Sequence, residues 1–260
     1  MGYTSMATYF ESKNDNGKVV INDTTRMLSL LRCGHVSELA SCVDATNFNW
    51  NGAGVSNDRG AGSAAIYRLS LADDEKLVAF SVLDNENIAV CTSQLSPSSI
   101  DIIIFRTRTI SDDIASIASK IRLYVFGEDY SANNSCGMQL FDENGKLIFK
   151  NTDYMMNVKG AWNISVDMFR KKCNSLPASY LITDNANNIA VVCSAYAGNW
   201  VMSPYNDIPP WCGVYAISRK GTALYAKLIV MFWFNDCYRY YNGLNNQSSA
   251  LLIDITNAPM

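Results

Sequence analysis

The chain has 260 residues, a formal charge of −3 and only 17% charged residues. Residues 1–133 carry 11 basic and 16 acidic side chains, and residues 134–260 carry 10 and 8. Neither half has the basic excess typical of proteins that bind nucleic acid. The longest strictly apolar run, 228–234, is too short to cross a bilayer, and no basic-then-apolar segment opens the chain. We therefore expect no nucleic-acid binding, no membrane insertion and synthesis in a cytoplasm.

Short strand-like runs, separated by Asn, Asp, Gly and Ser, follow one another along the chain. They cover residues 18–22, 66–71, 77–83, 88–92, 100–106, 121–126, 138–141, 147–149, 162–166, 180–182, 189–193, 214–218, 224–234 and 250–255. Short strands at near-regular spacing predict antiparallel β-sandwiches. Both faces of 225–234 are apolar, so we expect this strand to be central and covered on each side.

Helix is scarce in the pattern. The best candidate is 111–120, with Ser111 as N-cap and Asp112 and Asp113 in the first turn. A weaker candidate is 166–173. The glycine-rich stretch 51–62 is expected to be an exposed loop, because no Gly-Lys-Ser/Thr follows it as a phosphate loop requires.

One hairpin signature occurs twice. An aromatic and an acidic residue lead into Asn16-Gly17-Lys18 and again into Asn144-Gly145-Lys146, each followed by three apolar residues. Asn-Gly between two strands favours a type I′ turn, because both residues accept a positive φ. Further correspondences pair 83–93 with 183–194 and 121–126 with 229–234, in the same order.

The repeated order predicts an internal duplication. We therefore expect an all-β chain of two tandem antiparallel β-sandwich domains, 1–130 and 131–260, with at most one or two short helices. Each is long enough to have its own core. The linker falls within 127–137.

Eight cysteines lack CxxC spacing, and only Cys91 and Cys193 occupy matching places in the repeat. A disulfide framework would be expected to repeat with the module, so we interpret the cysteines as reduced and mostly buried. With a single histidine, His35, a zinc site is not expected.

Candidate catalytic groups are few. His35 lacks any evident arrangement with a nucleophile and is interpreted as structural. The acidic runs 73–75 and 112–113 suggest turn and helix-start charges rather than the paired carboxylates of a glycosidase. We expect no enzymatic activity, cofactor or metal; a polysaccharide hydrolase is a distant alternative.

Aromatic residues concentrate in the second half. Tyr, Trp and Arg commonly anchor interfaces, and aromatic faces stack on sugars. Trp211 follows two prolines and is the residue most expected to be exposed. The alternative reading is that these rings cover the base of the sandwich core. The candidate contact surface comprises Trp200, Tyr205, Trp211, Tyr238, Arg239, Tyr240 and Tyr241.

The segment 137–149, Gly-Met-Gln-Leu-Phe-Asp-Glu-Asn-Gly-Lys-Leu-Ile-Phe, and the strand ending Tyr124-Val125-Phe126-Gly127 resemble the β-sandwich structural proteins encoded among bacteriophage tail genes. The opening 6–24 matches less closely, because its turn is longer and Glu11 stands where Asp is usual. The likeness covers about a third of the chain.

The resemblance implies a non-enzymatic virion component, at the tail or its tip, made in the cytoplasm of a host bacterium. The implied partners are other phage tail proteins and further copies of the chain in a homo-oligomer. The alternative is a receptor- or carbohydrate-binding module of the adsorption apparatus, with a host surface glycan or receptor as partner.

Overall fold

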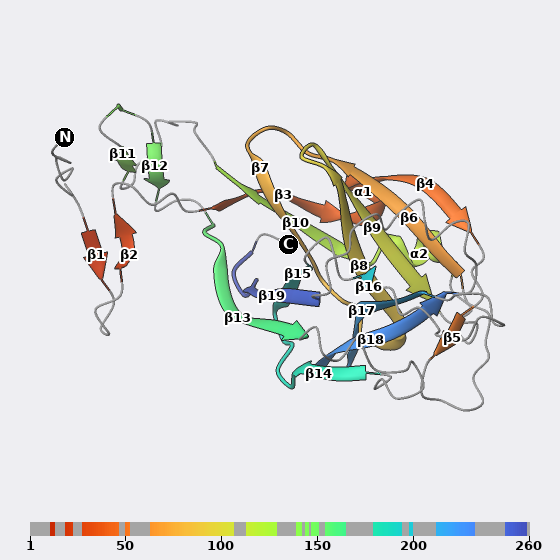
Figure 1. Ribbon diagram of the computed structural model, residues 1–260. Helices are drawn as coiled ribbons and strands as arrows, with labels where there is room; N and C mark the ends of the chain where they lie inside the picture. The colour runs from red at the N-terminus through yellow and green to blue at the C-terminus, as the bar shows by residue number, and fades with distance from the viewer. Residues whose placement is uncertain are drawn as a thin grey trace, which may run out of the picture.

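The computed structural model describes residues 11–13, 19–22, 28–46, 50–52, 63–106, 113–128, 139–141, 144–145, 147–150, 154–164, 179–193, 198–199, 212–231 and 248–258 (Figure 1). Two short helices, α1 (Val36–Leu39) and α2 (Ile114–Ala118), accompany antiparallel strands. The predicted all-β, sandwich-like fold is confirmed. The strands are β1 (Glu11–Lys13), β2 (Val19–Asn22), β3 (Ser29–His35), β4 (Ser41–Thr46), β5 (Trp50–Gly52), β6 (Ser63–Ser70), β7 (Glu75–Phe80), β8 (Asn85–Ser96), β9 (Ser99–Arg106), β10 (Arg122–Gly127), β11 (Gln139–Phe141), β12 (Leu147–Lys150), β13 (Asn157–Ile164), β14 (Ser179–Thr183), β15 (Ile189–Cys193), β16 (Gly198–Asn199), β17 (Cys212–Lys220), β18 (Ala223–Met231) and β19 (Ser248–Asp254).

Both predicted hairpins form. β1 pairs antiparallel with β2, and β11 pairs antiparallel with β12, each as a two-stranded sheet. Gly145 in the second turn has φ +76°, a backbone conformation that glycine adopts without steric cost, but five residues separate the paired Phe141 and Leu147, so the loop is longer than the two-residue type I′ turn that Asn-Gly favours.

A six-stranded sheet combines the two halves of the chain in the order β13-β19-β15-β7-β10-β3. β7 and β15 meet at Phe80 and Val191, so strands of the first half and the second half share one sheet. The expectation of a separate core in each half is therefore wrong for the described residues. The duplication itself stays a prediction.

The two outer strands of this sheet are also joined. The Leu30 amide donates to the Tyr154 carbonyl oxygen at 2.8 Å, and the Met156 amide donates to the Leu28 carbonyl oxygen at 2.9 Å. Residues 154–156 lead directly into β13, so the sheet curves back until its margins meet at this bridge. A small hydrophobic cluster that includes Tyr124, Phe126 and Ile253 packs on one face.

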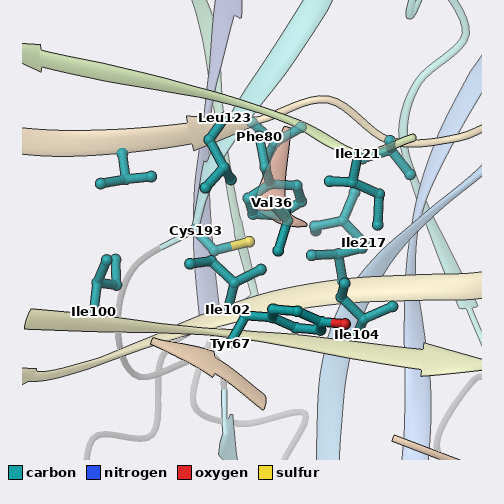
Figure 2. Close-up of a cluster of buried hydrophobic side chains, with 14 of the residues drawn as sticks. Val36, Tyr67, Phe80, Ile100, Ile102, Ile104, Ile121, Leu123, Cys193 and Ile217 are labelled. Atoms are coloured by element: carbon teal, nitrogen blue, oxygen red, sulfur yellow. The ribbon is translucent and has the colours of Figure 1, made fainter. Parts of the chain in front are cut away.

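The main core lies on the opposite face. Phe80 and Leu123 of the six-stranded sheet share one cluster with Ile102 and Ile104 of β9 and Ile217 of β17 (Figure 2). The covering layer consists of a four-stranded sheet, β4-β6-β9-β8, and a further sheet, β14-β18-β17-β16, in which β5 also pairs with β18. β17 lies against β8.

Three sequence expectations are refined here. β18 lies between β14 and β17, which confirms the predicted central strand as far as Met231. Residues 51 and 52 belong to β5 rather than to a loop. The N-cap of α2 is Asp113, whose side chain accepts a hydrogen bond from the Ser116 amide at 2.6 Å, and not Ser111. Ser111 and the candidate helix 166–173 lie outside the described residues, and α1 was not anticipated.

Gly127 occupies a position where the chain passes very close to another backbone segment. A Cβ atom there would lie 2.1 Å from the Asp74 carbonyl oxygen, and the next amide, Glu128 N, donates to that oxygen at 2.9 Å. This contact explains why glycine ends the Tyr-Val-Phe-Gly strand.

We therefore predict that Gly127→Ala lowers the free energy of unfolding by about 2 kcal/mol, because a rigid backbone atom must move. Gly160→Ala is a matched control, since its Cβ would meet only Leu252 Cδ1 at 3.8 Å, an ordinary contact. Urea unfolding of the two variants checks this, and equal stability would contradict the assignment.

Candidate contact surface

All seven residues of the predicted aromatic contact surface lie outside the described residues. Trp200, Tyr205, Trp211, Tyr238, Arg239, Tyr240 and Tyr241 therefore stay a prediction. The surface that the structure does describe was not anticipated.

Four large hydrophobic side chains are exposed in the described part of the chain. They are Val43 (47% exposed) on β4, Phe141 (46%) on β11, Val158 (46%) on β13 and Leu181 (56%) on β14. Each belongs to a strand at the margin of its sheet or to a two-stranded hairpin. Marginal strands carry backbone donors and acceptors that can pair with another chain. Sequence reasoning missed these residues because their exposure depends on the order of the strands in each sheet, which decides which strands lie at an edge.

An aromatic contact links the margins of two sheets. The rings of Trp162 on β13 and Tyr180 on β14 have centroids 6.3 Å apart, and Tyr180 lies 5.5 Å from the buried Tyr215 of β17. Trp162 and Tyr180 are partly buried, so the same rings close the core and reach the surface. This contact fixes β13 and β14 near each other.

His35 has a structural role, as expected. Its backbone amide donates to Glu38 Oε2 at 2.8 Å, and its Nδ1 lies 3.2 Å from Glu38 Oε1, which holds the first turn of α1. These hydrogen bonds hold the pKa of the Glu38 carboxyl below its usual range. On the neighbouring strand, Arg122 Nη2 contacts the Cys33 sulfur at 3.7 Å. In this part of the described structure, the imidazole contacts Glu38 and the Cys33 thiol contacts Arg122.

Two carboxylates are buried against arginines. Glu75 accepts from Arg32 Nε at 2.5 Å, from Arg32 Nη2 at 2.8 Å and from the Ala72 amide at 2.9 Å. Asp101 on β9 accepts hydrogen bonds from Nε and Nη2 of Arg68, which lies opposite it on β6. Glu75 closes the turn at residues 72–75, as expected for a turn charge, and its carboxylate is buried because Arg32 of β3 lies beside it. Asp113 is a helix-start charge, as predicted.

The four described cysteines, Cys33, Cys42, Cys91 and Cys193, form no disulfide bond; the expected burial holds for Cys91 and Cys193, whereas Cys33 is half-buried and Cys42 is exposed. Cys91 and Cys193 are fully inside the core. Burial raises the pKa of the Cys91 thiol to about 12 and that of Cys193 well above its usual value, so neither forms thiolate near neutral pH.

The two corresponding Asp-Asn segments of the repeat approach the same hairpin. Asp84 Oδ1 accepts from the Gly221 amide at 2.5 Å, while the Ala186 amide donates to the Thr222 carbonyl oxygen at 2.7 Å. Lys220 also pairs with Glu86 at 2.9 Å. Both segments thus hold the turn between β17 and β18.

Within the ranges that the structure describes, no group of three His, Cys, Asp or Glu side chains could hold a metal ion. Among those residues, no helix is long and apolar enough to span a membrane. Searches for a matching family model, a similar curated protein or a similar solved structure found none.

Asp254, the last residue of β19, links this strand to the edge strand β13. Its carboxylate accepts two hydrogen bonds from Thr256, at 2.9 Å from the amide and 2.6 Å from the hydroxyl, and lies 3.0 Å from Lys159 Nζ on β13. These interactions lower the pKa of Asp254 to about 2.

A carboxyl with a lower pKa in the folded state stabilises the fold above its unfolded pKa, and that contribution is lost as pH falls through the folded value. We predict that Asp254→Asn is less stable than wild type at pH 7 and that the difference shrinks from about pH 4 to about pH 2. Urea unfolding across this range checks it. A difference that is constant with pH would contradict the role of this carboxylate.

Proposed function

We propose that this protein is a non-enzymatic structural subunit of a bacteriophage virion, located in the tail or at its tip. There it contacts other tail proteins and further copies of itself. The observation that carries the proposal is the placement of the exposed large hydrophobic side chains on marginal strands and on a hairpin. A subunit built into a larger particle needs several such surfaces, because each neighbour covers a different one.

The hairpin resemblance supports the same role. The 137–149 segment, which resembles tail proteins, includes β11, whose Phe141 is 46% exposed. An exposed aromatic ring on a two-stranded hairpin suits contact with a neighbouring subunit. Two ion pairs between a partly exposed arginine and a buried carboxylate, Arg32 with Glu75 and Arg68 with Asp101, join neighbouring strands, which suits a scaffold.

We predict that this polypeptide is a component of the purified particles of the phage that encodes it, in several copies per particle. Quantitative mass spectrometry of gradient-purified virions measures this, with an abundant host protein as the marker of contamination. Depletion from the particle to the level of that marker would overturn the virion assignment.

Glycan or receptor binding is the second candidate function. It rests on the aromatic residues of the second half, to which Trp162 and Tyr180 add two partly exposed rings. We predict that wild type binds bacterial surface glycans on an array and that Trp211→Ala binds at least about tenfold more weakly, because stacking aromatics dominate such sites. Equal binding by both proteins would remove Trp211 from the site.

A further inference from the structure

We infer that the six-stranded sheet is a fused dimer. Its β7-β10-β3 side and its β15-β19-β13 side are two copies of one unit, related by a two-fold axis. The surface with which each unit contacts the other therefore fits a second copy of the same unit. This arrangement goes beyond the virion role proposed above and does not depend on it.

The strand order is the same on both sides of the sheet's centre. Outward from β7 and β15, which meet there, β10 and β19 come next, and β3 and β13 come last. β3 and β13 each follow a hairpin of the repeated signature. The two contacts between the sides, β7 with β15 and Ser29 with Met155, are both antiparallel, as a two-fold axis requires.

The covering layer follows the same order. Outward from the contact between β8 and β17, the next strands are β9 and β18, followed by β6 and β14. Along the chain, β6, β7, β8, β9 and β10 thus correspond one by one to β14, β15, β17, β18 and β19. Among the described strands, β4, β5 and β16 fall outside this match.

The hairpin signature aligns the two units residue by residue. Lys18 and Lys146 occupy the same place in the signature, and their numbers differ by 128. With this offset, Leu28 corresponds to Met156, and the Met156 amide donates to the Leu28 carbonyl oxygen at 2.9 Å. A residue that pairs with its own counterpart lies on the two-fold axis, so the axis passes between Leu28 and Met156.

A β-bulge falls at the same place in both units. The register of β3 with β10 skips Leu31, and the register of β13 with β19 skips Lys159. The numbers of these two residues again differ by 128. A bulge inserts one extra residue into a strand, and its position is a specific feature of a protein family rather than a requirement of strand pairing. The shared bulge therefore supports the alignment independently of the hairpin signature.

The middle strands extend the alignment to the centre of the sheet. Val125 of β10 and Leu252 of β19 each pair with the residue that follows the bulge. On their other side they pair with Val78 of β7 and Val191 of β15. Val78 and Val191 are therefore counterparts, and all four side chains belong to the main core.

The contact between β7 and β15 gives a second point on the axis. Phe80 pairs with Val191, and the same antiparallel register sets Ala79 opposite Val192. Because Val78 and Val191 are counterparts, Ala79 and Val192 are counterparts too. Both pack in the small hydrophobic cluster, so the axis passes through that cluster.

This alignment keeps the hairpin signature and replaces the two other sequence correspondences. β7, rather than residues 83–93, takes the place that β15 has in the other unit, and β19, rather than 229–234, takes the place of β10. Each unit buries its side of the contact against the other, which explains why the two units share one core.

A circular permutant tests the fused dimer, because a two-fold axis makes the two connections between the units equivalent. Residues 128–138 connect β10 to β11, and residues 255–260 joined to 1–10 supply a longer connection from β19 to β1. The permutant starts at Ser131 and joins Met260 directly to Met1. We expect its unfolding equilibrium constant to stay within about tenfold of the wild-type value, because neither unit is interrupted.

A permutant that starts at Thr222 and has the same joined ends is the matched control. It cuts the turn between β17 and β18, where the Gly221 amide donates to Asp84 and the Ala186 amide donates to the Thr222 carbonyl oxygen. We expect its unfolding equilibrium constant to rise at least about a hundredfold, because a hydrogen-bonded turn inside one unit is cut. Circular dichroism and urea unfolding measure both proteins. Equal stability of the two permutants, or a Ser131 permutant that does not fold, would overturn the fused dimer.

Nuclear Overhauser contacts give a second measurement, on the unmodified protein. We expect cross-peaks between the backbone protons of Leu28 and Met156 and between those of Ala79 and Val192, because each pair lies on the axis. If either contact is absent, the axis is wrong. The virion assignment stands in that case, since it depends on finding the polypeptide in the particle.

Discussion

The pairing of β7 with β10 on one side and with β15 on the other is the contact on which the described architecture depends. It joins strands from the two halves of the sequence into a single sheet through Phe80 and Val191. The main core requires that continuity, because side chains from both halves fill the space between this sheet and the covering layer. Loss of the pairing between β7 and β15 would expose core side chains of both halves to water. The free energy of unfolding of each half therefore depends on the other half.

Local signals in the sequence were enough to predict the fold class and several elements. The Asn144-Gly145 turn defines its own hairpin, and the strand-length apolar runs predict antiparallel sheets without reference to distant residues. The predicted separate cores failed for a different reason. The similar segments 83–93 and 183–194 suggested two independent modules, but both hold the turn after Lys220, a relation that depends on tertiary packing.

The contrast between local signals and tertiary packing also explains which features of the candidate site could be predicted. The pattern around Glu75 indicates a turn, whereas its burial depends on Arg32, which lies 43 positions earlier in the chain. Four-residue α1 is too short to show a helical period. Leu181 lies in a predicted strand, yet its exposure depends on β14 being the marginal strand beside β18. The predicted contact residues were instead chosen because they are Trp, Tyr and Arg. The exposure of the described hydrophobic residues depends on which strands lie at the edge of a sheet.

The place of β19 in the six-stranded sheet has a consequence for how the protein is made. β19 lies between β13 and β15, although every other described strand is synthesised before it. Until residue 254 has emerged from the ribosome, β13 and β15 lack the strand that joins them, and the sheet cannot reach its closed form. Folding of this sheet is therefore completed late, through contacts between residues far apart in sequence, and such topologies fold slowly. During that interval the β13 and β15 edges are open to pairing with other chains, so the incompletely folded chain is prone to aggregation until β19 takes its place.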